Sequence, residues 1–189
     1  MIEKAFLFAY EKHKGVRKGS TIPYIVHPLD VASILMKEGA SEEVVSAGLL
    51  HDVLEDTDTN PHELKEGFGE EVAQLVKGAS EPEEYWNQSK EEKRKSWKKR
   101  KEHTIEYIKT ADKKIKILIC ADKLSNIRDT KNGLLLGKVD WAKFNAPQEE
   151  QKWYYEALLE SLKDIKDTDL WKMFEINVKE VFNDKSNNL

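Results

Sequence analysis

The chain has 189 residues, with 31 Lys and Arg against 35 Asp and Glu, and a formal net charge of −4. This length fits one domain with its own hydrophobic core, and the mild acidity argues against a partner as polyanionic as a long nucleic acid. Cys120 is the only cysteine, which excludes an intramolecular disulfide and a multi-cysteine zinc site. The sequence shows no membrane span and no signal peptide, so we expect a cytoplasmic protein without a membrane partner.

Apolar residues recur at helical spacing along nearly the whole chain. The predicted helices cover residues 2–12, 28–38, 41–55, 61–67, 69–78, 91–109, 113–130, 148–165 and 168–182. Pro28 suits a first helical turn, Gly39 a helix end, and Ser41 an N-cap, while Pro82 lies in an exposed loop over 80–90. We therefore predict a single all-α domain over 1–189, with about eight to ten helices.

The stretch 49–56, LLHDVLED, places four ionisable side chains on a helix that is otherwise apolar on all sides. These are His51, Asp52, Glu55 and Asp56, and at about 100° per residue they share one arc. Buried charges without partners cost several kcal/mol each, and three neighbouring carboxylates repel one another. A bound divalent cation would resolve this conflict, and mixed nitrogen and oxygen donors favour Mn²⁺, Fe²⁺ or Zn²⁺ over Ca²⁺.

Other residues are placed to complete such a site. His27 stands where a loop enters a helix, Asp122 follows the apolar run 115–121, and Asn126 lies one turn after Asp122 on the same face. The predicted metal ligands are His27, His51, Asp52 and Asp122. Two imidazoles and two carboxylates leave two positions of an octahedral ion for water and substrate.

These residues belong to an ordered series of motifs. In chain order the motifs are HKG at 13–15, RK at 17–18, PYIVHP at 23–28, LLHDVLEDT at 49–57, FG at 68–69 and ADKLSNIR at 121–128. Over about residues 1–165 the series resembles the RelA/SpoT-type hydrolase domains of the HD superfamily, in particular the stand-alone small alarmone hydrolases. The resemblance implies a helical HD domain that uses Mn²⁺ to remove the 3′-pyrophosphate of (p)ppGpp, a small nucleotide, giving GDP or GTP and pyrophosphate.

The resemblance also implies a role for each residue. The four ligands would hold the ion, and Glu55 and Asp56 would orient and activate the attacking water, with the choice of base left open. Arg17 and Lys18 would lie beside the base and phosphates of the nucleotide, and Asn126 would face the nucleoside.

Departures from the family pattern leave the exact nucleotide open. They are Val16, residues 78–80 (GAS), Ser125 and the long basic segment 81–103. An adenosine alarmone or NADPH is an alternative substrate. A catalytically silent nucleotide-binding module is a further alternative, although neither a ligand nor the Glu-Asp pair is missing.

Residues 90–103 contain eight Lys or Arg and three Glu. Such a run needs no function when it forms an exposed helix face with Glu–Lys pairs. The functional alternative is that a basic side chain of this run leans over the site and meets phosphate. The candidates are Lys98, Lys99, Arg100 and Lys101.

Overall fold

A computed structural model describes residues 1–17 and 21–182, and its regular structure there is helical, apart from an isolated bridge between Val16 and Pro23. The predicted all-α class is confirmed. The α-helices are α1 (Ile2–Lys12), α2 (Val26–Lys37), α3 (Glu42–Leu50), α4 (Val53–Asp56), α5 (Pro61–Phe68), α6 (Glu70–Ala79), α7 (Lys90–Lys95), α8 (Trp97–Thr110), α9 (Lys113–Leu135), α10 (Gln148–Ser161) and α11 (Asp169–Phe182). In the described residues, three 3-10 helices lie in the connections: η1 (Glu83–Tyr85), η2 (Trp141–Lys143) and η3 (Lys163–Ile165).

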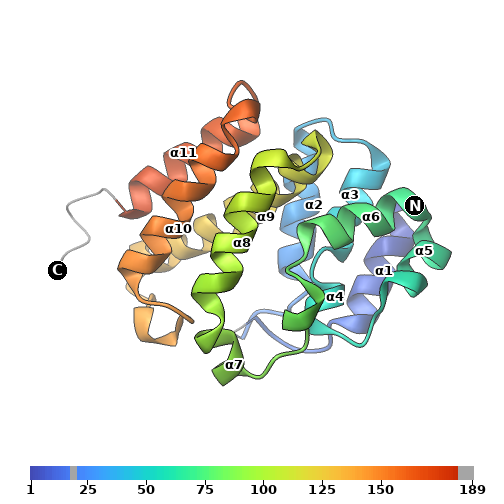
Figure 1. Ribbon diagram of the computed structural model, residues 1–189, viewed down its shortest axis with the longest axis horizontal. Helices are drawn as coiled ribbons and strands as arrows, with labels where there is room; N and C mark the ends of the chain where they lie inside the picture. The colour runs from blue at the N-terminus through green and yellow to red at the C-terminus, as the bar shows by residue number, and fades with distance from the viewer. Residues whose placement is uncertain (18–20, 183–189) are drawn as a thin grey trace.

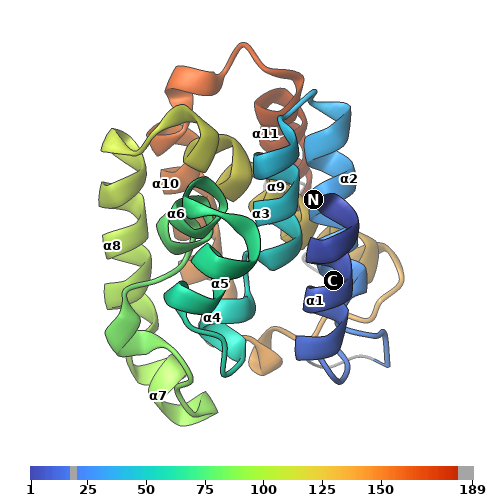
Figure 2. The same ribbon diagram turned by 90° about the vertical axis from the view of Figure 1, so that its right-hand side faces the viewer.

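Helices α3 and α9 organise the packing. Helix α3 packs against α1, α2 and α6, while α9 packs against α2, α6 and α11. In Figure 1, α10 and α11 lie on one side of α9, and α1 and α5 lie towards the opposite side. Figure 2 shows α4 and α7 at the same end of the molecule. Within the described ranges, no helix is both long and apolar enough to cross a membrane.

Gly48 sets the close approach of α2 and α3. A Cβ atom at this position would lie 2.5 Å from Cδ1 of Leu35 and 3.4 Å from Cγ1 of Val31. Both neighbours are fully buried, so neither has free space into which to move. This close contact brings the start of α2 next to the end of α3, where two of the predicted ligands lie.

The prediction of one continuous helix over 41–55 is wrong, because the helix is broken at His51 and Asp52 into α3 and α4. Nδ1 of the His51 ring lies 2.8 Å from the Gly48 carbonyl, an acceptor that an uninterrupted helix would use for the next turn. The carbonyl of Asp52 then accepts the N–H groups of Glu55 and Asp56 at 3.2 and 3.0 Å, which starts α4. A side chain competing for a backbone acceptor explains the break.

The predicted helix over 91–109 is also divided, into α7 and α8, at Ser96. The Ser96 hydroxyl donates to the carbonyl of Glu92 at 2.8 Å, an i−4 bond of the kind that bends helices. Elsewhere Asn60 caps α5 and Asp112 caps α9 through their side chains, whereas Ser41 occupies the N-cap of α3 without a side-chain bond to it.

Other helix ends need smaller corrections. Helix α2 starts at Val26 rather than Pro28, and α5 ends at Phe68 rather than at Gly67. Gly69 follows α5 with φ of +89°, a conformation that glycine adopts without strain. Helix α9 continues to Leu135, beyond the predicted end at 130. Helix α10 stops at Ser161, and a short 3-10 turn replaces the rest of the predicted 148–165 helix.

Candidate active site

Three predicted ligands from three helices meet in one cluster. His27 comes from the first turn of α2, His51 from the end of α3, and Asp122 from the middle of α9. The two Nε2 atoms lie 3.2 Å apart, and Oδ1 of Asp122 lies 3.1 Å from Nε2 of His27 and 3.6 Å from Nε2 of His51. One ligand atom from each residue lies within 4.8 Å of the others, so the three can hold one ion.

The hydrogen bonds behind the two imidazoles suit a metal site. A carbonyl only accepts, so Nδ1 of His51 carries the proton that faces Gly48, and the neutral ring presents its Nε2 lone pair to the cluster. Nδ1 of His27 lies 3.0 Å from Oγ of Ser125, which orients the second ring. Both rings are buried. Outer hydrogen bonds that fix ring orientation in this way are typical of metal-ligating histidines, so the donor set fits a divalent cation.

Charge at the cluster supports the same conclusion. Burial lowers the pKa of His51, but the carboxylates of Asp52 and Asp122 outweigh this effect and raise the pKa well above its usual value. The pKa of Asp122 is held well below its usual range, against burial, by Lys123 and the two imidazoles. The cluster therefore requires positive charge beside its carboxylates, which a divalent cation would supply with both rings neutral.

Asp52, the fourth predicted ligand, lies beside the cluster. Its Oδ1 is 3.2 Å from Nε2 of His51, and its Oδ2 is 3.8 Å from Nε2 of His27. The hydroxyl of Tyr24 donates to Oδ2 of Asp52 at 2.6 Å and lies 3.0 Å from Oδ2 of Asp56. Burial and these two carboxylates raise the pKa of Tyr24, so the phenol stays protonated. Sequence reasoning gave Tyr24 no role of its own, although it lies in the PYIVHP motif.

Glu55 and Asp56 have different surroundings. Burial raises the pKa of Glu55 to about 7, and the charges of Glu81 and Asp52 add to this effect. The backbone N–H of Glu81 donates to Oε1 of Glu55 at 2.9 Å. Asp56 instead receives the Lys93 ammonium on Oδ1 at 2.7 Å. Glu55 can therefore exchange a proton near neutral pH, whereas Asp56 has a cation and a hydroxyl against its two oxygens.

Asn126 and Arg17 lie on the α9 side of the cluster. The Asn126 amide donates to Oδ1 of Asp122 at 2.6 Å, as their spacing predicts. Nη2 of Arg17 donates to Oδ1 of Asn126 at 2.9 Å and to Asp129 at 3.1 Å. Lys123, which sequence reasoning did not assign, donates to Oδ2 of Asp122 at 2.6 Å. The predicted residue Lys18 lies outside the described residues.

The basic segment 90–103 contacts the site through a residue that was not expected to do so. Lys93, which was not among the four candidates, reaches Asp56. Arg100 and Lys101 bind the Glu81 carboxylate, and the backbone N–H of Glu81 in turn donates to Glu55. The remaining two candidates bind other partners. Lys98 pairs with Glu150 and lies over Trp153, and Lys99 lies over the Tyr85 ring.

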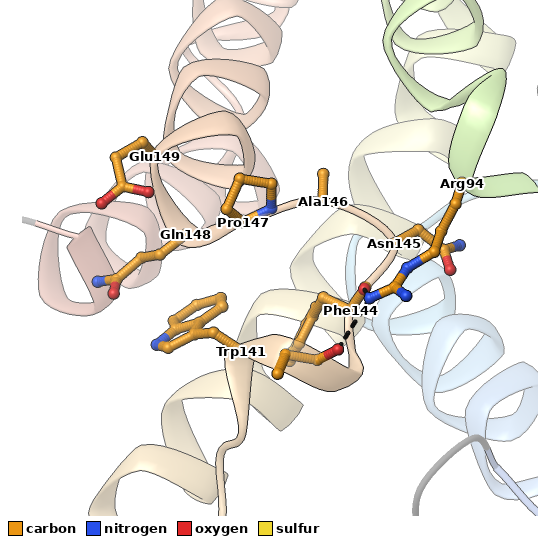
Figure 3. A pocket seen from close by; sticks show the side chains of 9 residues that line it. Arg94, Trp141, Phe144, Asn145, Ala146, Pro147, Gln148 and Glu149 are labelled. Atoms are coloured by element: carbon orange, nitrogen blue, oxygen red, sulfur yellow. Dashed lines mark hydrogen bonds between the residues drawn. The ribbon is translucent and has the colours of Figure 1, made fainter.

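A cavity of about 510 Å³ lies beside α7 (Figure 3). It is lined by Arg94, Trp141, Ala142, Phe144, Asn145, Ala146, Pro147, Gln148 and Glu149. Nη2 of Arg94 donates to the carbonyls of Ala142 and Phe144 at 3.0 and 3.4 Å. Because the neighbouring residue Lys93 reaches Asp56, α7 connects the rim of this cavity with the α4 end of the site.

Comparison with known proteins identifies the fold that carries this cluster. The sequence matches the HD domain over residues 5–138, a range that includes all four predicted ligands. The chain belongs to the HD-domain family. Among curated relatives, the guanosine-3′,5′-bis(diphosphate) 3′-pyrophosphohydrolase MESH1 of Xenopus tropicalis is 37% identical over 135 residues, which are 69% of this chain and 70% of that protein. The enzyme of the same activity from Aquifex aeolicus is 51% identical over 79 residues, 42% of this chain.

The extent of these matches differs. The chain spans 11% of the Aquifex protein and 10% of a Synechocystis protein named as a probable guanosine-3′,5′-bis(diphosphate) 3′-pyrophosphohydrolase. The solved structure of lmo0812 from Listeria monocytogenes EGD-e is 34% identical, with a TM-score of 0.72 over 90% of this chain and 99% of that one. A metazoan orthologue of SpoT, described as hydrolysing ppGpp, matches with a TM-score of 0.73 over 98% and 96% of the two chains. At 24% identity the latter shows the fold alone.

Proposed function

We propose that this protein is a metal-dependent hydrolase that removes the 3′-pyrophosphate of (p)ppGpp, giving GDP or GTP and pyrophosphate. The observation that carries the proposal is the convergence of His27, His51 and Asp122 beside Glu55. The similarity to the MESH1 hydrolase over 70% of its length supports the choice of substrate. A cytoplasmic location, expected from the sequence, accords with such a substrate.

His27, His51, Asp52 and Asp122 would hold the ion. Bound there, a divalent cation supplies Lewis-acid polarisation of a phosphoryl oxygen. The mixed set of two imidazoles and two carboxylates suits Mn²⁺, Fe²⁺ or Zn²⁺. Mn²⁺ is the proposed ion because the resemblance to the RelA/SpoT-type hydrolase domains implies it. Tyr24 restrains Asp52 by the hydroxyl hydrogen bond, and Ser125 restrains His27.

Glu55 acts as the general base in this proposal. It takes a proton from the water whose oxygen attacks the phosphorus next to the 3′ oxygen. The bond between that phosphorus and the 3′ oxygen then breaks, and the 3′ oxygen leaves with a proton that Glu55 can return. A pKa near the working pH is what this two-way role requires. Asp56, which is bonded to Tyr24 and Lys93, orients the attacking water rather than accepting its proton.

Basic and amide groups around the cluster would bind the nucleotide. Arg17 and Asn126 are proposed to contact it, which requires that Arg17 exchange its bonds to Asn126 and Asp129 for bonds to substrate. Lys93 is proposed to face phosphate, because its ammonium already lies against Asp56 at 2.7 Å. Lys18 stays a predicted contact.

A panel of nucleotides tests the choice of substrate. Purified protein with Mn²⁺ is incubated with ppGpp, pppGpp, the corresponding adenosine alarmone and NADPH, and the kcat/KM values are compared. The proposal expects the guanosine alarmones to have the highest values. A higher value for the adenosine alarmone or NADPH would keep the chemistry and replace the substrate, and no turnover of any of them with metal bound would favour a silent binding module.

A further inference from the structure

A buried charge network lies behind Glu55, on the side of α8. Both oxygens of the Glu81 carboxylate are bonded to cations, one to Nη1 of Arg100 and the other to Nζ of Lys101 at 2.8 Å. The Glu81 and Arg100 side chains are only 10% and 5% exposed. Further donor groups of Arg100 bond to the Lys93 carbonyl at 2.7 Å and to Oγ of Ser96 at 3.0 Å. The guanidinium therefore has little freedom to move.

Glu81 connects this network to Glu55 through its backbone. Its N–H donates to Oε1 of Glu55 at 2.9 Å while its side chain is anchored to α8. The backbone N–H of Asn87 also donates to the Glu55 carbonyl at 3.1 Å, which ties the same connecting segment to α4. The position of Glu55 therefore depends on a loop that two cations of α8 hold in place.

We propose that Glu81, Arg100 and Lys101 form a positioning device for Glu55, in which the two cations fix Glu81 and its N–H aims the Glu55 carboxylate. The proposal rests on the proposed function, in which Glu55 is the general base. It gives the basic run at 90–103 a role inside the protein: Arg100 and Lys101 act on the base through Glu81 rather than by binding phosphate. Glu81, Arg100 and Lys101 are positioning residues, because among these three residues and Glu55 only Glu55 would meet the reacting water.

The charges of the network would also set the acidity of Glu55. Lys101 lowers the pKa of Glu55, whereas Glu81 raises it. Asp52, at the turn between α3 and α4, acts in the same direction as Glu81 and is left unchanged in the test. A salt bridge that only ties the loop to α8 would alter stability when broken, but it would not move the titration of Glu55 in opposite directions.

Two charge-removing variants test the device. Glu81→Gln keeps the backbone N–H and leaves two unpaired cations, so the pKa of Glu55 should fall, whereas Lys101→Met should raise it, each by about one pH unit. Carboxyl-labelled glutamate followed by ¹³C NMR measures this titration in the full-length chain, without metal and with diamagnetic Zn²⁺. Glu83→Gln and Lys99→Met make the same charge changes at exposed neighbours and should leave Glu55 unchanged. Unchanged or equal shifts in the two test variants would overturn the proposal.

The activity assay separates this proposal from the proposed function. The acid limb of kcat/KM for ppGpp should move down in Glu81→Gln and up in Lys101→Met, and Lys101→Arg should restore it. Opposite NMR shifts without any turnover of ppGpp by the unmodified protein would refute the substrate and keep the network. Turnover of ppGpp together with an unchanged titration of Glu55 in both variants would support the substrate and refute the network. If Glu81→Gln does not fold, the rise in Lys101→Met and its rescue by Lys101→Arg decide the question.

Discussion

The Nε2 atoms of His27 and His51 lie 3.2 Å apart, although the two residues are 24 positions apart in the sequence. Each ring is oriented from behind, by Ser125 for His27 and by the Gly48 carbonyl for His51. Two nitrogen atoms that face each other at this distance repel unless a proton or a cation lies between them. The pair is therefore placed to share a bound cation.

Metal binding should stabilise the fold, and Asp122→Ala should abolish this effect. A ligand at a hundredfold excess over its Kd adds about 2.7 kcal/mol to the free energy of unfolding, which for a chain of this size raises Tm by roughly 5–11 °C. Thermal unfolding with and without Mn²⁺ measures the shift. The control His62→Ala, at an exposed histidine, should keep it. A full shift in Asp122→Ala would remove this residue from the ligand set.

Gly48→Ala should destabilise the protein through the contact of α2 with α3. The added methyl group would lie 2.5 Å from Cδ1 of Leu35, a fully buried side chain. Overpacking of this kind costs about 1–3 kcal/mol. Denaturant unfolding measures the change.

Gly67→Ala is the matched control for that substitution. Gly67 lies in helix α5 and a Cβ there would meet no atom within 4 Å. Alanine should therefore leave stability unchanged or raise it by up to about 1 kcal/mol. Equal losses in both variants would show that the effect does not come from the α2–α3 contact.

The helices themselves could be predicted from the sequence because their periodicity is a local property. Their interruptions could not, because each coincides with one side chain that bonds to a backbone carbonyl, His51 to Gly48 and Ser96 to Glu92. The single-domain organisation over 1–189 stays a prediction.

The site was predictable where its residues lie in motifs, and not where distant charges meet. His27, His51 and Asp122 come together as expected. Glu81 was missed because residues 80–90 have the composition of an exposed loop, although its partners Arg100 and Lys101 follow 19 and 20 positions later and bury its side chain. Nothing in a local pattern shows that pairing.

Tyr24→Phe should weaken metal binding without unfolding the protein. The substitution removes the hydroxyl that donates to Asp52 at 2.6 Å and leaves the ring stacked on His13 at a centroid distance of 4.4 Å. Loss of such an outer contact lowers metal affinity about 10–100-fold. Titration calorimetry with Mn²⁺ tests this, and Tyr10→Phe, at an exposed tyrosine, serves as control. Unchanged affinity in Tyr24→Phe would exclude a role for the hydroxyl in holding Asp52.

Glu55→Gln should stabilise the metal-free protein at high pH. The pKa of Glu55 is about 7 in the folded chain, above the ordinary value of 4.5, so the folded state binds the proton more tightly than the unfolded state. Its cost to stability is absent below pH 4.5 and grows as the pH rises to 7, reaching roughly 1–3 kcal/mol. Unfolding at pH 5 and pH 8 measures the difference between the variant and the unmodified protein. An advantage at pH 5 that disappears at pH 8 would contradict this assignment.

The most direct test of the central claim is the release of pyrophosphate from ppGpp by the Mn²⁺-loaded protein, with GDP measured as the second product. The proposed function predicts one pyrophosphate for each GDP, turnover that stops on chelation and returns with Mn²⁺, and no turnover in Asp122→Ala. Absence of pyrophosphate from the unmodified protein with its metal bound, or equal release by Asp122→Ala, would contradict it.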